Sequence, residues 1–139
     1  MRQPGVVGGF VTLGRPMPNP TVLYCLTRDH ELATGLDDRL GGAIGFFYND
    51  AARLHQAVVL RRPDLVVIDT SAIRREYGDA GLGPVIGFVR ERAPEATVAV
   101  RPSSGAHWLV GAEAGEGVEM LPAESAGCVE AVARLCGCD

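Results

Sequence analysis

The sequence has little that would let the protein enter a membrane or bind nucleic acid. No stretch approaches the roughly 18 consecutive apolar residues that a membrane-spanning helix requires, and residues 1–14 lack the apolar core of a secretory signal. The net charge is −4, and the arginines occur in scattered pairs such as Arg61 and Arg62. Because nucleic acids and anionic membranes bind clustered positive charge, we expect neither as a direct partner. A cytoplasmic location is expected.

Cysteine is also scarce, which leaves little basis for a disulfide framework or a metal site. The four cysteines are Cys25, Cys128, Cys136 and Cys138. Their spacing is irregular, and no histidine or second cysteine pair lies at the sequence spacing of zinc ligands. The three histidines are dispersed, and no nucleophile is paired with a base. We therefore expect no metal, no cofactor and no enzymatic activity.

The size of the chain favours a single domain. With 139 residues and 47% hydrophobic content, the chain can bury one core and is too short for two ordinary domains. Residues 1–20 hold four of the nine prolines and four glycines, which disfavour regular hydrogen-bonded structure. We expect a flexible tail or linker over 1–20, with a short strand in GGFVTL as its only regular part, and one domain over 21–139.

Strands and helices alternate from residue 21 onward. Apolar, β-rich runs predict strands at 21–27, 43–48, 64–69, 97–100 and 118–121. Helical spacing of apolar residues predicts helices at 29–41, 51–62, 82–93, 105–115 and 126–136, and residues 70–81 are expected to form a loop. This alternation predicts an α/β fold, a three-layer αβα sandwich with a five-stranded, doubly wound parallel sheet.

Asp69 stands out as a candidate functional residue. It ends the apolar run DLVVID, whose lack of polar positions is typical of a central strand covered on both faces. Ligands and reacting groups of doubly wound sheets gather at the carboxyl ends of the strands. Asp69 is therefore either a reacting group or the polar end of a buried strand.

Residues 21–136 resemble the receiver domains of bacterial two-component response regulators. The resemblance is carried by RRPDLVVIDTSA, by GLGPVIGFVRERAPEATVAV and by GAEAGEGVEMLPAES, in that order along the chain. It implies a flavodoxin-like sheet with strand order 2-1-3-4-5, and it places Asp69 at the position that accepts a phosphoryl group in that family.

The acidic pocket that the resemblance implies is altered. Family members hold Mg²⁺ with the acceptor aspartate and an acidic pair after the first strand. Aligning DHEL with the family's usual DPEL puts Thr27 and Arg28 at that pair, and Asp29 could serve only if the register slips by one residue. One carboxylate beside a guanidinium is a poor site for an ion that requires hard oxygen ligands.

The switch positions are altered as well. The resemblance implies a lysine after the fifth strand, where this chain has Pro122 or Ala123. The hydroxyl position at the end of the fourth strand falls on Arg101 or Pro102, with Ser103 just beyond it. Phosphoryl transfer to a carboxylate needs cations to neutralise the developing charge, and these departures remove them.

Arg28 suggests a replacement for the missing cations. An arginine at a strand end could form a salt bridge with Asp69 and hold the domain in one conformation. In the alternative interpretation, Arg28 points to solvent and Asp69 caps the turn that follows it. The sequence leaves both interpretations open.

These observations favour an atypical receiver domain that signals by protein contact, without phosphorylation. We expect a protein partner, with a homodimer through the fourth helix, fifth strand and fifth helix as one form of contact. Trp108 lies in the expected fourth helix and is either an interface anchor or a core residue. The domain would act alone as an adaptor or as part of a larger protein.

Three alternatives remain. One is a receiver that is phosphorylated on Asp69. A second is an anti-sigma-factor antagonist, because LVVIDTSA followed by DAGLG resembles part of that STAS fold; Ala80 at its phosphorylated position and the additional strand and helix at 43–62 oppose this. The third is a receiver-like domain that senses a small molecule at the altered acidic pocket.

Overall fold

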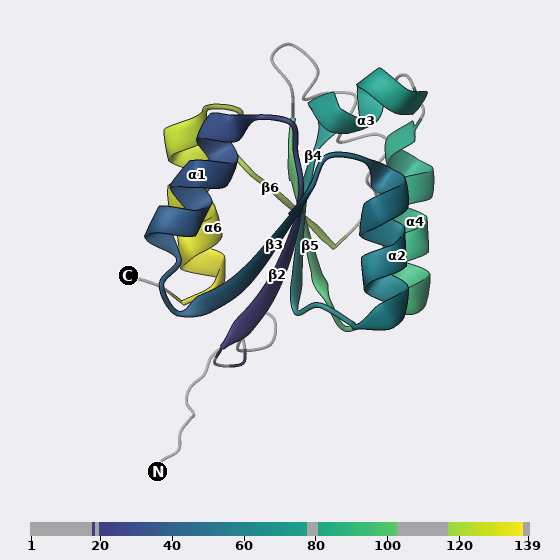
Figure 1. The fold of residues 1–139 in the computed structure, drawn as a ribbon, viewed down its shortest axis with the longest axis horizontal. Coiled ribbons are helices and arrows are strands. Elements are labelled where there is room, and N and C mark those ends of the chain that lie inside the picture. Colours follow the sequence, from purple (N-terminus) through teal and green to yellow (C-terminus); the bar gives the residue numbers. More distant parts are fainter. Residues whose placement is uncertain (1–17, 19, 78–80, 103–116, 138–139) are drawn as a thin grey trace.

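The computed structural model describes residues 18, 20–77, 81–102 and 117–137 (Figure 1). The strands are β2 (Thr21–Leu26), β3 (Ala43–Tyr48), β4 (Leu65–Asp69), β5 (Thr97–Arg101) and β6 (Val118–Met120). The helices are α1 (His30–Arg39), α2 (Ala51–Leu60), α3 (Thr70–Tyr77), α4 (Leu82–Arg92) and α6 (Ser125–Leu135). Among the described residues, no helix combines the length and the apolar character needed to cross a bilayer.

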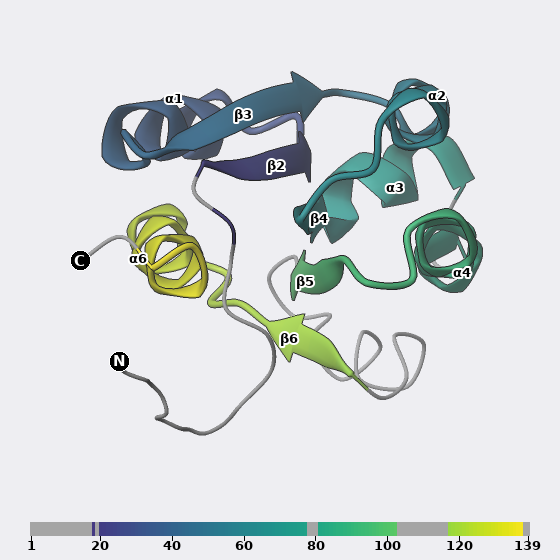
Figure 2. The ribbon, with the colours of Figure 1, turned by 90° about the horizontal axis from the view of Figure 1, so that it is seen from below.

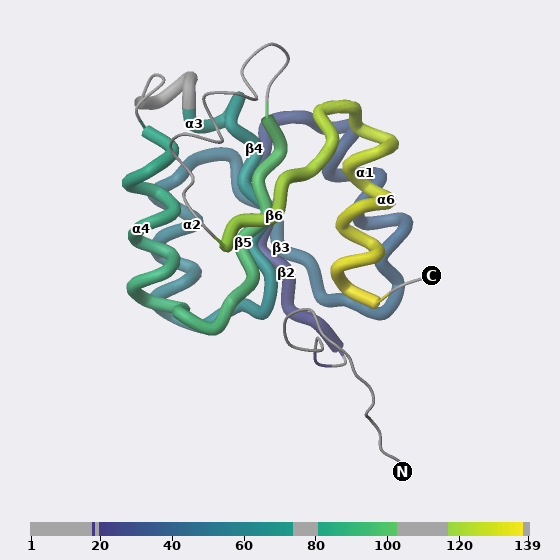
Figure 3. Tube along the Cα trace, turned by 180° about the vertical axis from the view of Figure 1, so that it is seen from behind, coloured from purple at the N-terminus to yellow at the C-terminus, as the bar shows by residue number. Residues whose placement is uncertain are grey.

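The strands form one parallel sheet in the order β3-β2-β4-β5-β6. Counted along the chain from β2, this is the order 2-1-3-4-5, so the predicted flavodoxin-like, doubly wound fold is confirmed. Figure 2 shows β3 and β6 at the two edges, with α1 and α6 on one face of the sheet and α2, α3 and α4 on the other. In Figure 3 the pairs α1 with α6 and α2 with α4 lie side by side.

The apolar pattern of the sequence explains this arrangement. Every residue of β2 and β4 is buried, as expected for central strands that are covered on both faces. One core lies under α2, α3 and α4 and includes the predicted stripe of Leu82, Val85, Ile86 and Val89. The other core lies under α1 and α6. It includes the predicted i, i+4 stripe of Leu32, Leu36 and Leu40.

Helix starts bring polar groups to the carboxyl ends of the strands. Asp29 caps α1, with its Oδ1 accepting from the backbone N–H groups of Glu31 and Leu32. Asp50 caps α2 in the same way by accepting from the N–H of Arg53. Such caps satisfy N–H groups that have no partner within the helix.

The loop predicted for residues 70–81 is wrong over most of its length. Helix α3 begins at Thr70, directly after β4, and its Ala72 and Ile73 are buried. Two adjacent apolar residues give no helical periodicity, so the pattern could not reveal this helix. Its start is stabilised by Asp69, whose Oδ1 accepts from the N–H of Ser71 at 3.1 Å.

Several predictions fall on residues outside the described ranges. They concern most of the tail over 1–20 with its short strand, the helix over 105–115 with Trp108, and the positions of Ala80 and Ser103.

Candidate functional site

The candidate site lies at the carboxyl ends of three neighbouring strands. Asp69 is the last residue of β4, and Arg101 is the last residue of β5. These two residues are direct partners in the parallel register. Thr27 follows β2 on the other side of β4. The sheet order therefore places a hydroxyl and a guanidinium on either side of the buried Asp69.

Both oxygens of the Asp69 carboxylate are occupied by protein donors. Oδ2 accepts from Thr27 Oγ1 at 2.7 Å and from Arg101 Nη1 at 3.3 Å. Oδ1 accepts from the N–H of Ser71 at 3.1 Å and from Ser71 Oγ at 2.8 Å. Since the Asp69 side chain is only 2% exposed, these bonds take the place of its lost hydration.

Arg101 joins the site to the segment between β6 and α6. Its Nη1 donates to Asp29 Oδ2 at 2.8 Å as well as to Asp69. Its Nε donates to the backbone carbonyl of Ala123 at 2.8 Å, and its Nη2 donates to Ser125 Oγ at 3.2 Å. The planar guanidinium thus bridges two carboxylates and fixes the segment that leads into α6.

Asp29 completes the network. Its Oδ1 caps α1, while its Oδ2 accepts from Arg101 and from Ser125 Oγ at 3.1 Å. The hydrogen bond from Arg101 lowers the pKa of Asp29 below its usual value, against the opposing effect of partial burial. For Arg101, burial works to lower the pKa, but the bond to Asp29 and the charges of both aspartates outweigh it, so the pKa is raised.

The predicted Arg28–Asp69 salt bridge is wrong. Within the part of the chain that the structure describes, Arg28 is exposed and the cation bound to Asp69 is Arg101. The alternative interpretation holds for both residues, because Asp69 also caps the start of α3 through Ser71. Arg28 does not bind Asp69, because it lies one residue beyond Thr27, on the turn into α1. The Thr27 hydroxyl occupies the position next to the Asp69 carboxylate.

The structure brings most of the altered positions together, in roles that the sequence did not indicate. Thr27 and Arg101 bind Asp69, Asp29 joins them through Arg101, and Ala123 contributes its backbone carbonyl. Pro122 is exposed next to them. Sequence reasoning missed Ser71 and Ser125. The sequence feature that could have indicated Ser125 is its position directly before the helix predicted at 126–136, after the last strand.

The residues present do not suit the Mg²⁺ that the receiver resemblance implies. Among the described residues there is no cluster of three histidine, cysteine, aspartate or glutamate side chains that could hold a metal ion. The carboxylates of Asp29 and Asp69 share the Arg101 guanidinium. A divalent ion would have to displace that guanidinium to reach its oxygen ligands.

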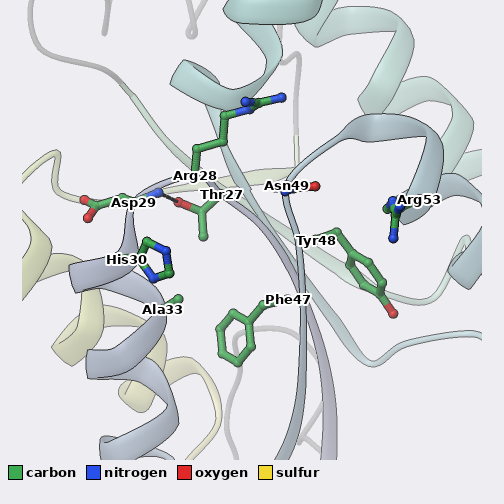
Figure 4. Close-up of a pocket in the computed structure, with 9 residues that line it drawn as sticks. All are labelled: Thr27, Arg28, Asp29, His30, Ala33, Phe47, Tyr48, Asn49 and Arg53. Carbon is green, nitrogen blue, oxygen red and sulfur yellow. Dashed lines mark hydrogen bonds between the residues drawn. The ribbon is translucent and has the colours of Figure 1, made fainter.

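An open cleft lies beside this network. It has a volume of about 610 Å³ and is lined by Thr27, Arg28, Asp29, His30, Ala33, Phe47, Tyr48, Asn49 and Arg53. Figure 4 shows His30 and Ala33 on the α1 side and Tyr48 and Arg53 on the α2 side, with Phe47 between them. In the same figure the Arg28 side chain extends in a different direction from the Asp29 carboxylate (Figure 4). The cleft thus carries two exposed arginines outside the Asp69 network.

Comparison with known proteins gives structural matches. No family model and no curated protein matches the sequence. The structure of NtrX from Brucella abortus, solved in complex with ADP, superposes with a TM-score of 0.64 at 16% identity over 84% of this chain. The match covers 27% of that NtrX chain, so this chain spans about a quarter of its length.

A second match is the pilus assembly protein CpaE of Burkholderia thailandensis. Its TM-score is 0.56 at 21% identity, over 85% of this chain and 98% of that one. Both identities are low, so the matches concern the fold. Together with the strand order, they show that this chain has a receiver-like fold.

Proposed function

We propose that this chain is an atypical receiver domain that acts through protein contact, without phosphorylation and without catalysing a reaction. The observation that carries the proposal is the Arg101 guanidinium, which binds both Asp29 and Asp69. It binds the two carboxylates that a divalent ion at this site would need as ligands. The carboxylate of Asp69 also has its four bonds to protein donors, so an incoming phosphoryl group would have to break them.

The composition of the chain supports the same conclusion. The sequence contains 13 arginines and no lysine, so no lysine of this chain can supply the second cation of a phosphorylated receiver. A single guanidinium already held by two aspartates and by Ala123 is a poor substitute, because moving it would expose two carboxylates to each other.

Two alternatives are less well supported. A receiver phosphorylated on Asp69 would have to work with Arg101 in its pocket. The structure of β3 and α2 opposes the anti-sigma-factor antagonist. These elements are the additional strand and helix at 43–62, which have no counterpart in the STAS fold. β3 pairs with β2 along its whole length, and α2 packs against both strands.

Intact mass spectrometry after incubation with acetyl phosphate and Mg²⁺ tests the proposal. We expect an unchanged mass for the wild-type chain, while a receiver known to be phosphorylated serves as the positive control. Arg101→Ala and Arg28→Ala form a matched pair of variants. The first removes the cation bound to Asp69, and the second removes an exposed arginine of the same region. A gain of one phosphoryl group by the wild type that is lost in Asp69→Ala would overturn the proposal.

The output surface we propose is the side formed by β6 and α6, next to the segment that Arg101 fixes. Met120 of β6 is 48% exposed there and offers apolar contact area. The partner is a cytoplasmic protein, with a second copy of the chain as one form of contact. Light scattering during size-exclusion chromatography should then report a dimer that Met120→Asp weakens, and a monomer at all concentrations would remove self-association from the proposal.

The cleft beside Thr27 supports a second candidate function, the binding of a small anionic molecule. Arg28 and Arg53 lie on its border, and Phe47 and Tyr48 supply flat apolar surface. A thermal-shift screen of anionic metabolites should find one that raises the melting temperature of the wild type and not of Arg28→Ala. If no compound of the screen does so, the cleft has no such function.

A further inference from the structure

The outer surface of α2 and α4 carries an apolar groove that the proposed function does not use. The groove has a volume of about 360 Å³ and is lined by His55, Gln56, Val59, Leu60 and Phe88. Val59 is 53% exposed and Leu60 is 86% exposed. α2 and α4 lie side by side on the face of the sheet opposite α1 and α6 (Figure 3). A groove between two neighbouring helices suits the apolar face of a third helix.

The walls of the groove are preorganised by ring contacts. The His55 ring stacks on the Phe88 ring, with centroids 4.0 Å apart and planes at 25°. These rings come from different helices, so their contact fixes the spacing of α2 and α4. A partner helix therefore meets a surface that needs little ordering when it binds.

Positive charge borders the groove. Arg61 and Arg62 follow Leu60 directly and are exposed. The Arg92 guanidinium carbon lies 5.4 Å from the centroid of the Phe88 ring. Residues 51–62 contain three arginines and no acidic residue, although the chain as a whole has a net charge of −4.

The acidic residues near this border have arginine neighbours. Asp50 caps α2, and its Oδ2 lies 3.3 Å from Arg53 Nε. Glu91 lies between Arg90 and Arg92 on α4. With Asp64 and Glu95 included, residues 50–64 and 88–95 hold five arginines and four acids, so the excess of positive charge is small and the arginines next to the exposed Leu60 are Arg61 and Arg62. This end of the groove favours a partner with negative charge beside its apolar stripe.

We propose that this groove docks an amphipathic helical segment of a partner protein whose apolar face is bordered by acidic residues. The chain's own residues 1–20 carry Arg2 and Arg15 and no acid, so their charge opposes binding there. A second copy could offer the acidic helix α1, but its Leu32 and Leu36 are buried in its own core. The groove is shallow, but it runs along two helices that lie side by side, and this shape matches one further helix.

Fluorescence anisotropy with two designed peptides tests the proposal on the full chain. The first is a labelled amphipathic helix of about 18 residues, five turns, with leucine at i, i+3, i+4 and i+7 and glutamate along the borders. The second replaces each glutamate by lysine. We expect the acidic peptide to bind at least about tenfold more tightly, a difference of about 1.4 kcal/mol. Equal binding of the two peptides, or no binding of the acidic one, would overturn the proposal.

Variants of exposed residues locate the contact without disturbing the fold. Leu60→Asp and Val59→Asp should each weaken binding of the acidic peptide by about tenfold or more. Thr34→Asp introduces the same charge at an exposed residue of α1, on the opposite face of the sheet (Figure 2), and should leave binding unchanged. An acidic peptide that binds Leu60→Asp and the wild type equally would place the contact elsewhere and contradict the proposal.

A membrane is the competing outcome. Phosphatidylcholine vesicles with about 30% phosphatidylserine would attract the same arginines. If these vesicles bind the wild type and not Leu60→Asp, the surface is a membrane contact and the proposal is wrong. The groove does not include Asp69 or Arg101, so the acidic peptide should bind Asp69→Ala like the wild type, and the result is independent of the phosphorylation test.

Discussion

At the scale of single residues, Arg101 and Arg28 differ in their contacts although both lie near strand ends. Arg101→Ala should lower the free energy of unfolding by about 2–4 kcal/mol, because it leaves the buried Asp69 carboxylate without its cation. Arg28→Ala should change it by less than about 0.5 kcal/mol, because Arg28 is exposed. Urea denaturation at neutral pH measures both variants. Equal losses would contradict the assignment of Arg101 as the partner of Asp69.

Acid pH should weaken the Arg101 network through Asp29. The hydrogen bond from Arg101 lowers the pKa of folded Asp29, below an unfolded value of about 3.9. Its contribution to stability is therefore fully present above that value and is lost as the pH falls through the lowered folded pKa. We expect the free energy of unfolding of Asp29→Asn to fall less steeply than that of the wild type below about pH 4.5.

Urea denaturation at several pH values from neutral to about pH 2 measures this slope. The control is Asp38→Asn, which changes an exposed carboxylate on the same helix. Its slope should match that of the wild type. If Asp29→Asn also keeps the wild-type slope, the Arg101 bond does not stabilise the ionised form of Asp29.

Asp69 could be predicted from the sequence and its cation could not. An aspartate directly after an apolar, fully buried strand marks the carboxyl end of a parallel sheet. The partner depends on strand order and register, because Arg101 meets Asp69 only when β4 and β5 are neighbours with their last residues opposite each other. The family pattern instead pointed to Arg28, because the alignment puts Thr27 and Arg28 at the positions of the acidic pair.

At the scale of elements, two helix glycines should respond in opposite ways to alanine. A Cβ on Gly35 of α1 would lie 2.9 Å from Val129 Cγ2 of α6, so either the Val129 side chain or the two helices must shift. A Cβ on Gly87 of α4 would meet nothing within 4 Å. We expect Gly35→Ala to lower the free energy of unfolding by about 1–2 kcal/mol and Gly87→Ala to raise it by about 0.5–1 kcal/mol.

Thermal and urea unfolding of the two variants measure this contrast. Both changes gain the same helix propensity, so their difference isolates the close approach of α1 to α6. A stabilised Gly35→Ala would show that this pair of helices is not packed at the limit of contact.

The strands and most helices could be predicted because their apolar spacing is regular. β3 has the predicted bounds, and α1, α2, α4 and α6 agree with their predictions within one or two residues at each end. The start of α3 could not be predicted, since it depends on Asp69 acting as the last residue of a strand and also as a cap. Because Asp69 already marks the end of β4, the sequence has no separate capping residue that would indicate the start of α3.

At the scale of the whole molecule, the sheet divides the buried side chains into two cores, and the central strands β2, β4 and β5 contribute buried residues to both. Asp69 lies at the end of the layer they share, and Arg101 ties that layer to α6 through Asp29 and Ser125. The Arg101 network thus links β4, β5, α1 and α6. Removing it should loosen the α1–α6 side of the sheet more than the side of α2 and α4.

Thiol reactivity should show whether that side opens as a unit. Cys25 of β2 and Cys128 of α6 are buried in the same core, and burial raises the pKa of Cys128 to about 11. Because the thiolate is the reactive form, both should react with a disulfide reagent near pH 8 only when the core opens. We expect equal rates for the two in peptide mapping by mass spectrometry, with Cys136 at the partly exposed end of α6 reacting faster. A Cys128 that reacts well before Cys25 would show that α6 detaches alone, and Arg101→Ala should then widen the difference between the two rates.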